Sequence, residues 1–187
     1  MEAFLVSVAV VALGEIGDKT QLLALVLAAR FRRPWPIVAG ILIATLANHA
    51  LAGLVGNWIR AAVPADVLRW LVALSFFAVA AWALKPDTLD EEKAPTTHLG
   101  VFGVTVVAFF LAEMGDKTQV ATVVLAARFD SLAAVVVGTT IGMLIANVPV
   151  VFAGKLAAER IPFKAVRIAA ALLFTALGVW VLVAAPV

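Results

Sequence analysis

The stretch Glu15-Ile16-Gly17-Asp18-Lys19-Thr20-Gln21 places three charged side chains inside a run of otherwise apolar residues. It returns 98 residues later as Glu113-Met114-Gly115-Asp116-Lys117-Thr118-Gln119. A charge near the centre of a bilayer costs ~2.5–3.5 kcal/mol on insertion scales. A chain that carries such a stretch twice is expected to use its carboxylates, and we predict one cation site built from two related halves.

The composition indicates an all-α membrane protein with several spans. Of the 187 residues, 64% are hydrophobic and 14% are charged, whereas soluble domains contain ~25% charged residues. The mean hydropathy is +1.09. The net charge of +2 does not indicate nucleic-acid binding, because the basic residues cluster at the ends of apolar segments. The absence of cysteine excludes disulfides and thiolate metal ligands.

Six apolar segments reach the ~20 residues that a transmembrane helix needs. They cover roughly residues 3–29, 36–59, 67–84, 100–127, 132–154 and 164–184. The one clearly polar stretch, 85–99, separates the third segment from the fourth. We therefore predict a first three-helix repeat over 1–84, a polar linker over 85–99 and a second three-helix repeat over 100–187.

The two halves are related by the same offset along their whole length. It aligns Arg30-Phe31 with Arg128-Phe129, Arg69 with Arg167, and Trp82 with Trp180. Since each half contains three spans, an odd number, the second half must enter the membrane from the opposite side. This predicts an inverted-topology repeat, an architecture found in many secondary transporters.

The distribution of basic residues predicts the orientation, because cytoplasmic loops carry an excess of Lys and Arg. One side has nine basic residues: Arg30, Arg32, Arg33, Lys85, Lys93, Lys155, Arg160, Lys164 and Arg167. The other side has three: Arg60, Arg69 and Arg128. The linker is thus expected in the cytoplasm and both termini outside. Met1-Glu2 lacks the basic start of a signal peptide, which favours a multi-pass protein of a bacterial inner membrane.

The repeated stretch brings acids together if it is helical. At 100° per residue, Glu15 and Asp18 share one face, and Lys19 lies within reach of Glu15. Four carboxylates are the predicted metal ligands: Glu15, Asp18, Glu113 and Asp116. Gly17 and its counterpart Gly115 allow either a close approach of the helices or a local unwinding that frees backbone carbonyls.

Oxygen ligands without thiolates suit hard cations such as Mg²⁺, Ca²⁺ and Mn²⁺. Lys19 and Lys117 are predicted to compensate charge and not to bind the metal. Together with four carboxylates they leave a net charge of −2, which one divalent cation or two protons would neutralise. This equivalence is what a cation/proton exchanger needs.

Other polar residues within the spans are weaker candidates. Four side chains are candidate accessory ligands: Gln21, Gln119, Asn48 and Asn147. His49 is a candidate proton carrier. For Asn48, His49 and Asn147, hydrogen bonding between helices is an equally good interpretation. Thr20 and Thr118 are expected to serve helix packing rather than coordination.

Four alternatives stay open. Each Glu–Lys pair can be a structural ion pair that fixes helix register, and the chain can be a divalent cation channel or a structural membrane subunit. An intramembrane aspartyl protease is a remote alternative, since Gly-Asp within a span is part of such sites. That class shares a proton between two aspartates, whereas each Asp here comes with a Glu and a Lys.

The doubled Glu-x-Gly-Asp-Lys-Thr motif resembles that of a family of bacterial manganese exporters and Golgi or thylakoid calcium/manganese–proton antiporters, long described as an uncharacterised protein family. The resemblance covers essentially the whole chain. The motif positions are Glu15, Gly17, Asp18, Lys19 and Thr20, and Glu113, Gly115, Asp116, Lys117 and Thr118. It implies a secondary transporter, not an enzyme, that needs no cofactor and exports Mn²⁺ or Ca²⁺ from the cytosol, with protons as counter-ion. The missing leader favours the bacterial manganese branch.

Overall fold

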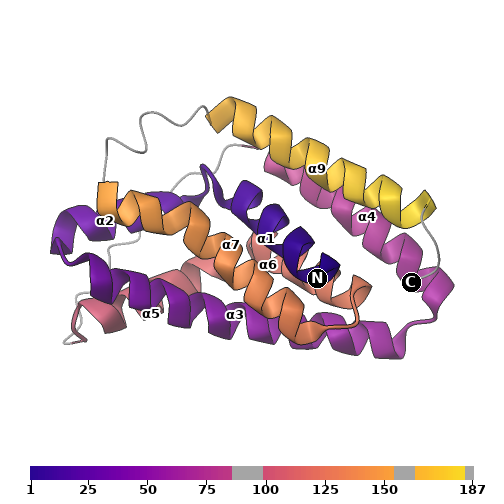
Figure 1. The fold of residues 1–187 in the computed structure, drawn as a ribbon, viewed down its shortest axis with the longest axis horizontal. Helices are drawn as coiled ribbons and strands as arrows, with labels where there is room; N and C mark the ends of the chain where they lie inside the picture. The colour runs from indigo at the N-terminus through magenta and orange to yellow at the C-terminus, as the bar shows by residue number, and fades with distance from the viewer. Residues whose placement is uncertain (86–98, 154–162, 184–187) are drawn as a thin grey trace.

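A computed structural model describes residues 1–85, 99–153 and 163–183, which contain eight helices and no strand (Figure 1). The helices are α1 (Glu2–Glu15), α2 (Lys19–Phe31), α3 (Pro34–Ala62), α4 (Ala65–Ala83), α5 (Val101–Glu113), α6 (Lys117–Arg128), α7 (Leu132–Ala153) and α9 (Phe163–Val183). The prediction of an all-α protein is confirmed. Most of the predicted polar linker, 86–98, lies outside the described residues.

The two stretches predicted as continuous spans, 3–29 and 100–127, are each broken in the middle. Gly17 separates α1 from α2 with φ 84°, and Gly115 separates α5 from α6 with φ 73°. Glycine adopts a positive φ without the steric penalty of a Cβ atom, so the first helix of each pair ends there. The prediction of a continuous helix through the motif was therefore wrong, and the local unwinding considered beside it is present in both copies.

Four of the six predicted spans are single helices long and apolar enough to cross a membrane. These are α3, α4, α7 and the stretch Lys164–Val183 of α9. The halves of the broken stretches contain only 12 to 14 residues each, fewer than the ~20 that a span requires. Only a pair laid end to end reaches that length, so the two broken spans stay predictions.

The two repeats interlock through their first helices. α1 packs against α7 of the second repeat, and its counterpart α5 packs against α3 of the first. Small residues allow the close approach, since a Cβ atom added at Gly142 would lie 2.7 Å from the Val8 carbonyl oxygen. In Figure 1, α1 lies between α7 and the α4–α9 pair. This exchange of helices brings the two broken stretches together inside the bundle.

Candidate cation site

The break places one acid on each side of the unwound turn. Glu15 is the last residue of α1, and Asp18 is the N-cap of α2, where its side chain accepts a hydrogen bond from the Thr20 backbone N–H at 3.4 Å. Glu113 and Asp116 occupy the same positions between α5 and α6. A carboxylate is stabilised at a helix N-terminus, whereas a helix C-terminus carries partial negative charge and attracts cations. The two glutamates therefore add their charge to helix ends that already favour a cation.

Three of the four predicted ligands are brought within reach of a single ion. One carboxylate oxygen from each of Glu15, Glu113 and Asp116 lies within 4.8 Å of the others, and all three residues are at most 2% exposed. Two oxygens that share a Ca²⁺ ion at 2.3–2.6 Å can be separated by at most about 5 Å. The fourth predicted ligand, Asp18, is also fully buried and forms an ion pair with Lys117.

The lysines pair across the two repeats. Lys19 Nζ lies 3.3 Å from Asp116 Oδ1, and Lys117 contacts Asp18 in the same way. The helical reading had placed Lys19 beside Glu15 of its own copy. In the broken motif, each lysine instead contacts the aspartate of the other copy. The two copies therefore form one charge cluster.

Two threonines orient the carboxylates, a role that the sequence analysis missed. Thr20 Oγ1 donates to Glu15 Oε2 at 2.5 Å, and Thr118 Oγ1 donates to Glu113 Oε2 and Asp116 Oδ2, both at 3.2 Å. Within the described part of the chain, the second oxygen of each glutamate, Oε1, has no hydrogen-bond partner. Buried polar atoms normally find one, so these two oxygens are free to bind an ion or a proton.

The sequence contains a signal for this role. Asp is one of the preferred N-cap residues of a helix, and the glycine before it is typical of the end of the preceding helix. A single helical wheel through the whole motif hides both signals and turns the threonine away from the glutamate.

The two glutamine side chains form hydrogen bonds with the backbone of the unwound turns. Gln21 Oε1 accepts the Gly17 backbone N–H at 2.9 Å, and Gln119 Oε1 accepts that of Gly115 at 2.7 Å. Their amide groups reach α7 and α3, which correspond to the second predicted span of the opposite repeat. Gln21 Nε2 donates to the Ala146 carbonyl at 3.0 Å, while Gln119 Nε2 donates to Asn48 Oδ1 at 3.3 Å. Both side chains adjoin the acids, and their role as accessory ligands stays a prediction.

The remaining candidates are buried in α3 and α7. Asn48 Nδ2 donates to the Phe110 carbonyl at 3.0 Å, which is the interhelical hydrogen bond considered as its alternative. Asn147 Nδ2 donates to the Met143 carbonyl of its own helix at 3.1 Å. Among the described residues, Asn147 Oδ1 and both ring nitrogens of His49 have no hydrogen-bond partner. His49 as a proton carrier and both asparagines as ligands stay predictions.

The charges of the cluster require a counter-charge. The ion pairs of the cluster join Lys19 to Asp116 and Lys117 to Asp18, so that two lysines face four carboxylates. Two buried anions a few ångströms apart repel each other strongly in a medium of low dielectric constant. A divalent cation or two protons would remove that repulsion, which is the balance expected of an exchange site.

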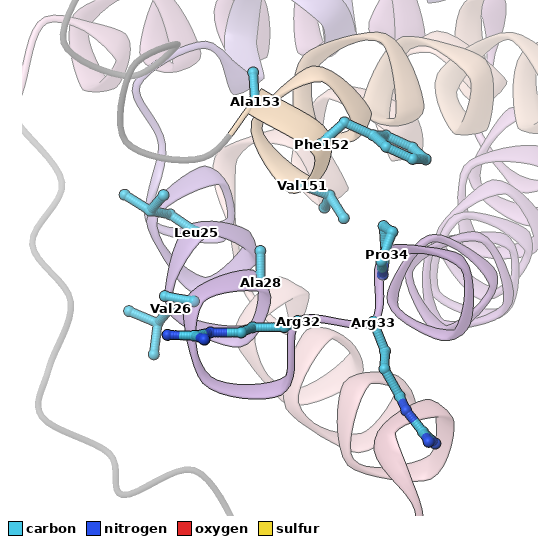
Figure 2. Close-up of a pocket in the computed structure, with 10 residues that line it drawn as sticks. Leu25, Val26, Ala28, Arg32, Arg33, Pro34, Val151, Phe152 and Ala153 are labelled. Carbon is cyan, nitrogen blue, oxygen red and sulfur yellow. The ribbon is translucent and has the colours of Figure 1, made fainter.

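A cavity that none of these acids lines lies elsewhere in the bundle. It has a volume of about 650 Å³ and is formed between the C-terminal turns of α2 and of α7, with Arg32, Arg33 and Pro34 at its edge (Figure 2). Its lining is mostly apolar and contains no carboxylate. The cavity therefore is not the cation site.

Comparison with known proteins identifies relatives over nearly the whole chain. A family model described as "Divalent cation/proton antiporter GDT1" matches residues 3–91 and 101–186. The chain is 51% identical to a Vibrio cholerae protein named "Putative manganese exporter", over 93% of this chain and 87% of that protein. It is 31% identical to a GDT1-like protein of Synechocystis sp. over 93% of each chain, and 27% identical to GDT1-like protein 5 of Arabidopsis thaliana over 96% and 94%. No solved structure matches the chain significantly.

Proposed function

Because the chain belongs to the GDT1 family of divalent cation/proton antiporters, a family of membrane transporters and not of enzymes, we propose that it exports a divalent cation from the cytosol in exchange for protons. Mn²⁺ is the substrate proposed first, since the name of the 51% identical relative refers to manganese. Ca²⁺ is the alternative, because carboxylate oxygens suit both ions.

One observation carries the proposal: acids from two distant stretches of sequence meet in one buried cluster. Glu15 belongs to the first copy of the motif, whereas Glu113 and Asp116 belong to the second, and their oxygens lie within 4.8 Å of one another. Structural ion pairs would need only one acid for each lysine. The glutamates exceed that need and each keeps an oxygen that no described residue engages.

The exchange follows from the charges. We propose that Glu15, Asp18, Glu113 and Asp116 bind the ion, while Lys19 and Lys117 compensate the aspartates. With one divalent cation or with two protons the cluster has the same net charge. Each loaded form therefore lowers the electrostatic cost of crossing the membrane interior, and the form with neither is disfavoured. The high electrostatic cost of the empty site thus couples the movement of the cation to that of the protons.

The proposed architecture is six spans in two inverted repeats, with α1–α2 and α5–α6 each crossing as one broken span. Broken helices that meet near the midplane and alternating access around them are typical of inverted-repeat transporters. We place the protein in a bacterial inner membrane with the central linker in the cytoplasm and both termini outside, in keeping with the nine-to-three distribution of basic residues. Its oligomeric state is left open.

The test is ion flux in proteoliposomes, with Mn²⁺ and with Ca²⁺, each with and without a pH gradient. We expect the protein to move a divalent cation faster when protons can flow down their gradient in the opposite direction. We also expect an imposed cation gradient to move protons in the direction opposite to the cation. Asp18→Asn combined with Asp116→Asn should abolish both fluxes. Glu2→Gln is the matched control, since Glu2 is an exposed acid at the start of α1.

Each other outcome contradicts a defined part of the proposal. Cation flux that ignores the pH gradient would indicate a channel. Absence of any flux from correctly inserted wild-type protein would favour a structural subunit. Undiminished flux in the double variant would exclude the carboxylate site.

A further inference from the structure

The bundle is closed differently at its two ends. We call the end that contains Met1, Arg128 and Val183 the terminal end, and the end that contains Phe31, Lys85 and Val101 the linker end. α4 and α9 pack together, α4 contacts α6, and α9 contacts α1. The equivalent contacts in the other repeat, α9 with α2 and α4 with α5, are at most marginal in the described part of the chain. Figure 1 accordingly shows the α4–α9 pair on one side of the molecule, away from α2 and α5.

The end of α6 contacts α9 through Arg128, Phe129 and Trp180, and we call this contact the terminal clasp. The guanidinium carbon of Arg128 lies 4.7 Å from the centre of the Trp180 ring, within the range of a cation–π interaction. The Phe129 ring lies 6.5 Å from the same ring. Arg69 strengthens this end of the bundle, because its guanidinium donates to the Leu182 carbonyl and joins α4 to α9.

The same three residue types recur at the linker end without the contact. Arg30, Phe31 and Trp82 are the equivalents of Arg128, Phe129 and Trp180 at the 98-residue offset. Arg30 is exposed and lies over its neighbour Phe31, 5.3 Å from the ring centre. Trp82 is 38% exposed. The residues that fasten one end are therefore present, and apart, at the other.

Packing between helices shows the same difference. At the terminal end, α3 and α6 are in such close contact that a Cβ atom at Gly56 would lie 2.8 Å from Ala126 Cβ. At the linker end, the equivalent helices α7 and α2 enclose the cavity of about 650 Å³ (Figure 2). Among the described residues, the helices are thus packed more closely at the terminal end than at the linker end.

α4 and α9 form one closely packed pair. Their Phe76 and Phe174 rings lie 6.3 Å apart, and a Cβ atom at Gly178 would lie 2.7 Å from the Phe77 ring. Phe174 also lies beside Gly14, next to Glu15 of the site. A tilt of this pair that released the terminal clasp would carry Trp82 towards α2, because both tryptophans belong to the same rigid pair.

We propose that Arg30, Phe31 and Trp82 form a second clasp, equivalent to the terminal clasp of Arg128, Phe129 and Trp180, and that the two clasps form alternately as the cation site opens to one side and then to the other. The proposal deepens the transport function proposed above and rests on it. In the orientation given there, the more loosely packed linker end of the present structure lies on the cytoplasmic side, while the acids of the site are buried. Formation of the linker clasp closes that side.

The natural absence of cysteine allows a direct test with single-cysteine reporters. Met114 is 57% exposed beside the second break, whereas its equivalent Ile16 is half-buried beside the first. By the symmetry of the two repeats, exchange of the clasps would cover position 114 and expose position 16, so Met114→Cys reports the present state and Ile16→Cys reports the exchanged state. Each reporter is combined with Trp180→Ala or Trp82→Ala, in proteoliposomes with a charged, water-soluble thiol reagent on both faces.

Trp180→Ala should raise the labelling rate of Cys at position 16 and lower that at position 114, each by about three- to tenfold, as expected from the loss of a cation–π contact that favours one of two states. Trp82→Ala should shift both rates in the opposite direction. Trp180→Phe keeps an aromatic face and should restore most of the wild-type ratio. Trp58→Ala, at a 69% exposed tryptophan outside both clasps, is the matched control and should change neither rate.

Three results would overturn the proposal: shifts of equal sign in Trp180→Ala and Trp82→Ala, shifts as large in Trp58→Ala, or no labelling of Cys at position 114 from either face. The labelling needs no metal and no transport, so it separates this proposal from the proposed function. Opposite shifts in a protein that moves no cation would support the clasps and contradict the transport function. Normal cation flux together with labelling shifts of equal sign would support the transport function and contradict the clasps.

Discussion

The two copies of the motif share six of their seven residues, yet they occupy different surroundings. Lys117 has a side chain only 4% exposed, whereas that of Lys19 is 28% exposed. Gln21 bonds to a backbone carbonyl of α7, whereas Gln119 bonds to the Asn48 side chain of α3. The difference arises because the α4–α9 pair covers α1 and α6 and not α2 and α5. Identical local chemistry thus becomes unequal through the packing of distant helices.

The largest expected effect tests whether the copies act as one site. Glu15→Gln and Glu113→Gln should each reduce cation export to background, because each removes a ligand charge from a shared cluster. The loss should exceed the ~10–100-fold that follows removal of a group outside the ligand shell. Initial rates of Mn²⁺ uptake into inverted vesicles measure it. Half-maximal activity in either single variant would show that the copies work independently.

Replacing the two lysines should lower the stability of the protein by different amounts, because their side chains are buried to different extents. Lys117→Gln removes the partner of a fully buried aspartate and should lower the free energy of unfolding by about 3–5 kcal/mol. Lys19→Gln affects a partly exposed pair and should cost about 1 kcal/mol or less. Thermal unfolding in detergent gives the comparison, with Lys85→Gln, an exposed lysine at the end of α4, as control. Equal losses for the two variants would contradict the difference in burial.

The threonines should matter through the orientation of the glutamates. Thr20→Val and Thr118→Val keep the side-chain volume but remove the hydroxyl that donates to Glu15 and Glu113. Groups that orient a metal ligand typically contribute ~10–100-fold to affinity, so we expect a loss of that size in Mn²⁺ affinity by calorimetry. Thr20→Ser and Thr118→Ser, which retain the hydroxyl, should bind nearly as well as wild type. Unchanged affinity in the valine variants would indicate that the threonines serve helix packing and do not orient the glutamates.

The smallest expected effect concerns the break itself. A Cβ atom at Gly115 would meet no atom within 4 Å, so Gly115→Ala tests the backbone conformation alone. The positive φ of 73° should make this variant less stable by about 1–2 kcal/mol. Gly100→Ala, also in open space but without a positive φ, is the control and should be neutral. A neutral Gly115→Ala would show that the turn does not need the left-handed conformation.

Much of this protein could be predicted from periodicity and repetition. The apolar runs identify α3, α4, α7 and α9, and the 98-residue offset pairs the helices of the two halves correctly. The four acids were recognised because charge inside an apolar run is costly. The breaks at Gly17 and Gly115 were missed because a helical wheel assumes continuity, although glycine followed by an N-capping aspartate marks a helix boundary in the sequence.

The sequence by itself determined that the protein is helical and apolar, that it carries two equivalent motifs, and which acids those motifs hold, because these properties depend on residue type and spacing. Only the tertiary structure decided that Lys19 pairs with Asp116 and Lys117 with Asp18, that the threonines bond to the glutamates, and that Trp180 is clasped while Trp82 is not. Pairings between residues about 100 positions apart depend on how the two repeats pack. Two equal halves can pack in two equivalent ways, and nothing in a repeated sequence chooses between them.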